Sequence, residues 1–143
     1  MNASERENAA TTAALLEGLR QQAEGLYYVS ETDAPFVVVH FPAMEGNEPT
    51  AAELTSWAGM PAGEKTETVT LAAFFRNQVT ETPDMGEEDR KMAQRFQQLQ
   101  AFLAQHLQDV KVYRVGARRK TALVLGRTRT GNLAGLKTQL VET

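Results

Sequence analysis

The sequence contains no cysteine and only two histidines, His40 and His106, among its 143 residues. Without cysteine the chain cannot form a disulfide, an iron–sulfur cluster or a thiolate zinc site, and it offers no thiol nucleophile. Neither histidine has a second one three or four residues away, which is the spacing of a helical zinc site. We therefore expect no metal site of the protein's own and assign both histidines to packing or surface roles.

Serine is also scarce, occurring only at positions 4, 30 and 56, and none of the three lies in a Gly-x-Ser-x-Gly turn. A catalytic triad would have to recruit one of the two distant histidines. The glycines of segment 126–132 are typical of a phosphate-binding loop, but Asn132 and Leu133 replace the Lys and Ser or Thr that hold phosphate and magnesium. We therefore expect a protein that is not an enzyme and binds no cofactor.

Long apolar runs are absent as well. Apolar residues make up 42% and charged residues 23% of the chain, and no stretch is long enough to cross a bilayer. The first residues are polar and acidic, unlike a secretory signal. We expect a cytoplasmic protein with a frayed N-terminal arm over residues 1–10 and a single domain over residues 11–143.

Charge is distributed unevenly along the chain. Residues 111–137 contain eight Lys or Arg and no Asp or Glu, whereas the rest of the chain holds all 18 acidic residues and only seven basic ones. This asymmetry indicates either an electrostatic role or a basic hairpin on an acidic body.

The first part of the chain shows one helical pattern and one strand pattern. Apolar residues at helical spacing predict a helix that Gly25 ends: Leu15, Leu19, Ala23 and Leu26. Residues 30–35 have turn chemistry, and the β-branched and aromatic run 36–41 predicts a strand.

Residues 42–65, which are rich in proline and glycine, predict an excursion that contains one short helix. Thr50 and Glu53 have the spacing of a capping box for this helix, and Gly59 marks its end. A second strand is expected from about residue 66 to residue 72.

A long helix should follow the loop 80–86, because Asp84 and Glu87 have the spacing of a capping box. Its apolar stripe is made of Met92, Phe96, Leu99, Phe102, Leu103 and Leu107. Two short apolar runs then flank residues 116–120 and predict a hairpin.

The spacing of the last apolar residues predicts a short C-terminal helix opened by Gly131 and Asn132; these residues are Leu133, Leu136, Leu140 and Val141. The predicted order is therefore α-β-β-α-β-β-α. We expect an α/β fold, a single-domain three-layer α/β/α sandwich with a small, mostly antiparallel sheet.

Glu31 and Asp33 lie two residues apart in the turn after the first helix. This spacing can present both carboxylates outward, as a general acid/base pair or a metal ligand requires. It is more typical of an Asx-type turn with solvated charge, because acidic turns are common and no third ligand is nearby in the sequence. The residues alone leave both interpretations open.

Several short segments of the chain also occur together in one known family. They are residues 112–116, 124–128, 131–135 and 141–143, with the pairs 25–26, 30–31, 35–36, 74–75 and 96–97 upstream. In these segments the chain resembles the nuclease A inhibitor (NuiA-like) family. The resemblance spans about Leu15 to Thr143 and is poor over residues 42–65.

The resemblance implies a three-layer α/β/α sandwich and an inhibitor of a sugar-nonspecific, magnesium-dependent endonuclease, as a monomer or a 1:1 complex. It implies that Glu31, in the turn after the first helix, reaches the catalytic metal of the nuclease and that Thr143 contributes to the interface. A carboxylate is a good ligand for a hard cation. Asp33 and the carboxylate of Thr143 would add charge that steers the encounter.

Two features depart from the family pattern. The loop before the long helix carries an aromatic anchor in the family, whereas here Asp84 and Met85 occupy it, and Met85 is the side chain available to fill a pocket. The hairpin is also strongly basic, which predicts repulsion from a cationic nuclease cleft.

The basic hairpin supports an alternative, a nucleic-acid-binding or anion-binding module that uses residues 111–137. Its phosphate contacts would come from Arg118, Arg119, Lys120, Arg127 and Arg129. Tyr113 is the aromatic residue near these cations that could stack on a base.

Overall fold

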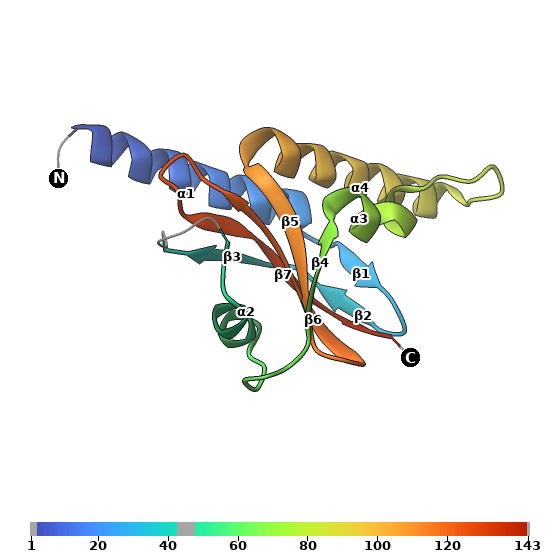
Figure 1. Cartoon of the computed structure of the whole chain (residues 1–143). Helices are drawn as coiled ribbons and strands as arrows, with labels where there is room; N and C mark the ends of the chain where they lie inside the picture. The colour runs from blue at the N-terminus through green and yellow to red at the C-terminus, as the bar shows by residue number, and fades with distance from the viewer. Residues whose placement is uncertain (1–2, 43–47, 143) are drawn as a thin grey trace.

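The computed structural model describes residues 3–42 and 48–142, with side chains from residue 11 onward. Their elements follow one another in the order helix, three strands, helix, strand, two helices and three strands (Figure 1). They are α1 (Ala3–Ala23), β1 (Tyr27–Val29), β2 (Asp33–Pro35), β3 (Val37–Phe41), α2 (Ala51–Ala58), β4 (Thr66–Thr70), α3 (Leu71–Val79), α4 (Glu87–His106), β5 (Gln108–Val115), β6 (Arg119–Arg127) and β7 (Leu133–Val141).

Five strands form one antiparallel sheet in the order β3-β7-β6-β5-β4. The other two, β1 and β2, form a separate antiparallel hairpin in which Tyr27 lies opposite Pro35 and Val29 lies opposite Asp33. The last strand of the chain therefore lies inside the sheet, between β3 and β6.

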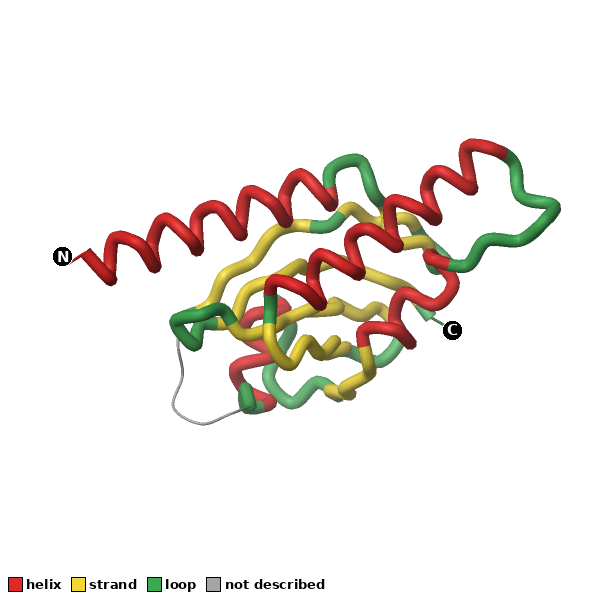
Figure 2. The backbone as a smooth tube through the Cα atoms, turned by 90° about the horizontal axis from the view of Figure 1, so that it is seen from above, coloured by secondary structure: helices red, strands yellow, loops and turns green. Residues whose placement is uncertain are grey.

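The two faces of the five-stranded sheet are covered unequally. Helices α1, α3 and α4 pack on one face, whereas the eight-residue α2 lies on the other (Figures 1 and 2). Alternate strand residues face the two cores, as a pleated sheet requires. Val112, Val124 and Leu136 face the larger helical layer, and Tyr113 and Leu123 face α2.

Several local predictions are confirmed. The first helix ends at Ala23, just before Gly25, which has a φ of 77°. Thr50 and Glu53 form the predicted capping box of α2, because each side chain accepts a hydrogen bond from the backbone N–H of the other. The basic hairpin is also present, as β5 and β6.

The predicted three-layer sandwich in the order α-β-β-α-β-β-α is wrong. The described chain has four helices, a five-stranded antiparallel sheet and a two-stranded hairpin, in a different order. The order differs because the segment before β3 forms the hairpin β1–β2, the short helix α2 counts as an element, the residues around Phe74 form the helix α3, and the last element is the strand β7. The side chain of Thr70 accepts a hydrogen bond from the N–H of Ala73, so the strand predicted to reach residue 72 ends at Thr70.

The predicted C-terminal helix is also wrong, because Leu133–Val141 is the strand β7. The first four residues of this strand are buried on both faces, whereas Gln139 near its end is exposed. Its apolar residues therefore fall in two groups, 133–136 and 140–141, whose spacing also matches a helix. Gly135 fixes its position: a Cβ there would overlap the carbonyl oxygen of Val124 on β6 and approach its carbonyl carbon to 2.9 Å.

Two details of the long helix differ from the prediction. The N-cap of α4 is Gly86, without a side-chain cap, so Asp84 and Glu87 form no capping box. Met92 is 44% exposed, and the neighbouring Ala93 is buried in its place. The remainder of the stripe lies on the sheet or close to it.

We expect Gly135→Ala to lower the free energy of unfolding by about 3 kcal/mol, because the new methyl group meets backbone that cannot move away cheaply. Urea denaturation measures this change. Gly86→Ser is the matched control: no atom lies within 4 Å of a Cβ at Gly86, so its stability should stay within about 0.5 kcal/mol of the wild type. Equal stability of the two variants would contradict the tight packing of β7 against β6.

Candidate partner-binding site

The acidic turn between β1 and β2 is built around the hydroxyl group of Ser30. The Ser30 Oγ donates to the carbonyl oxygen of Thr32 at 3.1 Å and accepts from the Thr32 N–H at 3.4 Å. The Ser30 N–H also donates to the Thr32 carbonyl at 2.9 Å. These bonds close a tight serine-type turn with Glu31 at its tip.

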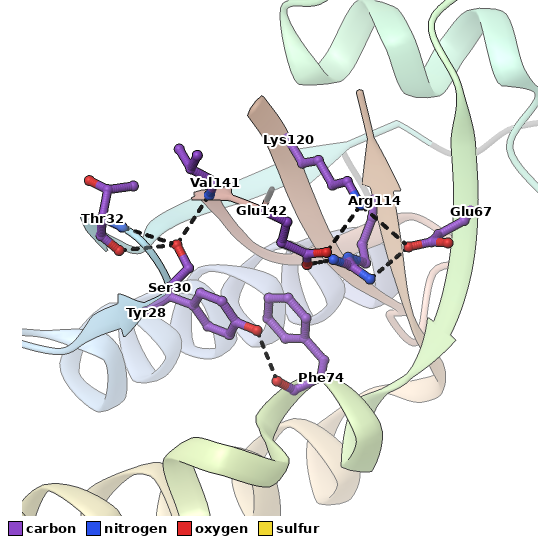
Figure 3. Close-up of polar contacts among 9 residues, drawn as sticks. All are labelled: Tyr28, Ser30, Thr32, Glu67, Phe74, Arg114, Lys120, Val141 and Glu142. Atoms are coloured by element: carbon purple, nitrogen blue, oxygen red, sulfur yellow. Dashed lines mark hydrogen bonds and ion pairs between the residues drawn. The ribbon is translucent and has the colours of Figure 1, made fainter. Parts of the chain in front are cut away.

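The turn is attached to the end of β7 (Figure 3). The N–H of Val141 donates to the Ser30 Oγ at 3.1 Å, and the N–H of Glu31 donates to the carbonyl of Val141 at 3.4 Å. The turn and the end of β7, which are far apart in the sequence, are therefore joined at Ser30 and at Glu31, the predicted contact residue. The side chain of Glu31 is exposed, as is Asp33 on the following strand.

The β1–β2 hairpin rests on the helical side of the sheet through its inward residues. Tyr28 stacks on Phe74 of α3 with ring centroids 4.4 Å apart, and its hydroxyl donates to the Phe74 carbonyl. The Thr138 Oγ1 on β7 donates to the carbonyl of Pro35 at 2.9 Å. Burial raises the pKa of the Tyr28 phenol, and nearby Arg114 partly opposes that rise. The tip of the hairpin is thus held by contacts with α3 and β7.

A cluster of four charges lies beside this attachment point (Figure 3). Arg114 on β5 pairs with Glu67 on β4 at 2.6 Å and with Glu142 after β7, while Lys120 on β6 pairs with Glu142 at 3.4 Å. The cluster contains two cations and two carboxylates, so its formal charge is zero. It ties Glu142, the residue after Val141, to two neighbouring strands.

The two cations are the most buried side chains of this cluster. The side chain of Arg114 is 16% exposed and that of Lys120 is 14% exposed. Burial lowers the pKa of the Lys120 ammonium, and the charge of Arg114 lowers it further, whereas Glu67 acts in the opposite direction. Arg114 and Lys120 are largely buried and are paired with carboxylates of the same chain, so their charges are already compensated within the protein.

The five cations of the alternative site are not brought together. Arg118, Arg119 and Lys120 lie at the hairpin end of β6, next to the end of β7, while Arg127 and Arg129 lie at the opposite end (Figure 1). The nine residues of β6 place these two groups about 26 Å apart. Lys120 is also paired with Glu142, whereas Arg118 and Arg119 are exposed.

The loop that carries Asp84 and Met85 projects at the same end of the molecule as the acidic turn (Figures 1 and 2). Asp84 is exposed and Met85 is partly buried. Side chains from α4 hold the loop, since Gln97 donates to the Val79 carbonyl at 2.8 Å and Gln94 donates to Glu81 at 3.2 Å. Thr143, the other predicted contact, lies outside the described residues.

Two further features of the described chain bear on its chemistry. No three acidic or histidine side chains within residues 11–42 and 48–142 gather as a set of metal ligands. None of the helices in the described ranges is both long and apolar enough to cross a bilayer. His40 and His106 are both exposed.

A model of the nuclease A inhibitor-like protein family matches residues 13–143. The match covers most of the chain, so the protein belongs to this family, as the resemblance predicted. No curated protein matches the chain. Membership in this family indicates a nuclease inhibitor, with a nuclease as the partner.

The sequence pattern identified the acidic turn but not what holds it. The charge pattern assigns Arg114 and Lys120 to a basic hairpin, because it cannot show that they pair with Glu67 and Glu142. The available signal was the alternation along β5, which places Arg114 on the same face as buried Val112.

We expect Ser30→Ala to lower the free energy of unfolding by about 1–2 kcal/mol, because it removes all the hydrogen bonds of the Ser30 Oγ. It should also raise the hydrogen-exchange rate of the Val141 amide. Ser56→Ala on α2 is the control and should change stability by less than about 0.5 kcal/mol, since Ser56 is exposed. An unchanged exchange rate at Val141 in Ser30→Ala would show that the turn is not attached through this hydroxyl.

Proposed function

We propose that this protein inhibits a sugar-nonspecific, magnesium-dependent endonuclease by inserting the Glu31 turn into the active site of the nuclease. The observation that carries the proposal is the attachment of an exposed acidic turn to the end of β7. The Glu31 carboxylate would bind the catalytic cation of the nuclease and exclude the scissile phosphate.

Rigidity of the hairpin supports this role. A two-stranded hairpin alone is marginally stable in water, and β1 and β2 have three residues each. Here the hairpin is held by the Tyr28–Phe74 stack and the hydrogen bonds of Ser30. A carboxylate on a pre-formed turn loses little conformational entropy when it binds, which favours affinity.

Charge at this end of the molecule also favours a cationic cleft as the target. Arg114 and Lys120 are paired with Glu67 and Glu142, so they contribute little net positive charge beside the turn. Asp33, exposed near the tip, adds negative charge that would steer the encounter. This pairing reduces the repulsion expected from a basic hairpin, although Arg118 and Arg119 remain exposed.

The other proposed contacts extend the interface on both sides of Glu31. Asp84 and Met85 would contact the nuclease from the loop before α4, with Met85 filling the pocket that an aromatic residue fills in the family. Thr143 would contribute a further contact to this interface.

The alternative of a nucleic-acid-binding module has less support. Backbone recognition requires a continuous positive track, and the cations that this function needs lie at the two ends of β6. We therefore do not propose it as the function of this chain.

We expect Glu31→Ala to weaken inhibition by about 2–5 kcal/mol, because it removes a charge that would be desolvated against the metal of the nuclease. The measurement is the inhibition constant against a panel of magnesium-dependent, sugar-nonspecific nucleases, determined for both forms side by side. Thermal unfolding should show that the fold is kept, since Glu31 is exposed.

Asp109→Asn is the matched control, because Asp109 is an exposed acid at the start of β5, at the end of the sheet opposite the hairpin end of β6. It should leave the inhibition constant within about twofold of the wild-type value. Full inhibition by Glu31→Ala would remove Glu31 from the mechanism, and a wild-type chain that inhibits no member of the panel would overturn the proposed function.

A further inference from the structure

Exposed apolar side chains gather on the outer face of the β1–β2 hairpin and the start of β3. In the described part of the chain, the exposed large hydrophobic residues are Tyr27 at 51%, Val29 at 59%, Val37 at 57% and Met92 at 44%. Three of the four lie within eleven consecutive positions, on β1 and β3. Grouped apolar exposure of this kind marks interaction surfaces, whereas single exposed residues are ordinary.

The strand register explains why these side chains point outward together. Tyr28 and Ala34 lie opposite each other and face the core, so their neighbours on β1 and β2 face solvent. Tyr27 is therefore paired with Pro35 on the outer face, and Val29 is paired with Asp33. The outer face is apolar at the base of the hairpin and becomes acidic towards its tip.

The base of the hairpin opens into a cavity of about 450 Å³ between the end of α1 and the start of β3. Its lining includes the buried Leu26 and the partly buried Phe36, and Tyr27, Pro35 and Val37 stand at its rim. The lining is largely apolar, with Arg20 and Glu24 as its charged members, and therefore suits an apolar side chain of another protein better than a charged ligand.

We propose that this cavity and its rim, Tyr27, Pro35 and Val37, receive an apolar side chain of the nuclease while Glu31 occupies the active site. This inference rests on the proposed function. The cavity is continuous with the proposed interface, because β1 joins Tyr27 at its rim to the acidic turn.

Charge around the cavity favours the same partner. The acids near it are Glu24 at its edge and Glu31 and Asp33 at the tip, while Arg20, the cation that lines it, is paired with Glu17 and Glu24. A surface with an apolar centre and acidic residues around it fits a protein whose cleft is cationic because it binds phosphate. The cavity would thus add an apolar contact from the hairpin to the contact proposed for Met85.

The test compares variants that change polarity but keep strand propensity: Tyr27→Thr, Val37→Thr and the double variant. Met92→Gln is the matched control, because Met92 is an exposed hydrophobic residue on α4 that does not line the cavity. Binding is measured by titration calorimetry against the nuclease of the panel that the wild-type chain inhibits most strongly. Thermal unfolding checks each fold, and sedimentation measures self-association.

We expect the double variant to bind about 30-fold more weakly or worse, each single variant to lose about 5- to 10-fold, and Met92→Gln to bind like the wild type. Binding of the double variant within twofold of the wild type, with Glu31→Ala still defective, would overturn this inference and leave the proposed function intact. Wild-type dimers that the double variant abolishes would also overturn it, by assigning the surface to a second copy of the chain. If the wild type inhibits no nuclease of the panel, both this inference and the proposed function are wrong.

Discussion

The arrangement of the proposed interface depends on the hydrogen bonds between the Ser30 turn and Val141. They connect a hairpin that precedes the sheet in sequence with the strand that completes it, so the acidic turn reaches its position only when β7 has been placed. β7 in turn requires Gly135, because any larger residue would collide with the backbone of β6. The geometry of an exposed carboxylate is therefore set by a buried strand.

The cluster of two cations and two carboxylates beside the Ser30 turn also holds the residue after β7, and it changes the interpretation of the basic segment 111–137. A run of cations read from the sequence indicates a surface for anions, but Arg114 and Lys120 face Glu67 and Glu142. Removal of either carboxylate would leave a largely buried cation short of a partner, which is costly. Glu142 thus holds the end of the chain in place and also neutralises cations that would otherwise lie next to the acidic turn.

Much of the local structure could be predicted from the sequence, because it rests on contacts between near neighbours. The capping box at Thr50 and the basic hairpin are of this kind. β7 could not be predicted, since its apolar spacing fits a buried strand as well as a helix, and the choice depends on how Gly135 packs against Val124 on the neighbouring strand β6. For the candidate site, the pattern indicated Glu31 and Asp33, but it could not reveal the bond to Val141 or the apolar exposure of Tyr27, which arise from tertiary packing.

The separation of roles along the hairpin explains how a single acidic residue could act with specificity. A carboxylate alone binds any accessible hard cation and would not distinguish one metal-containing cleft from another. Tyr27 and Val37 surround a cavity at the base of the hairpin, whereas Glu31 lies at its tip, so a partner has to fill the cavity and reach the carboxylate with one fixed separation. Because Tyr28 and Ser30 fix the hairpin to α3 and β7, that separation cannot adjust freely. Discrimination between nucleases would then come from the shape of the surface around their clefts, while the shared metal provides the common contact.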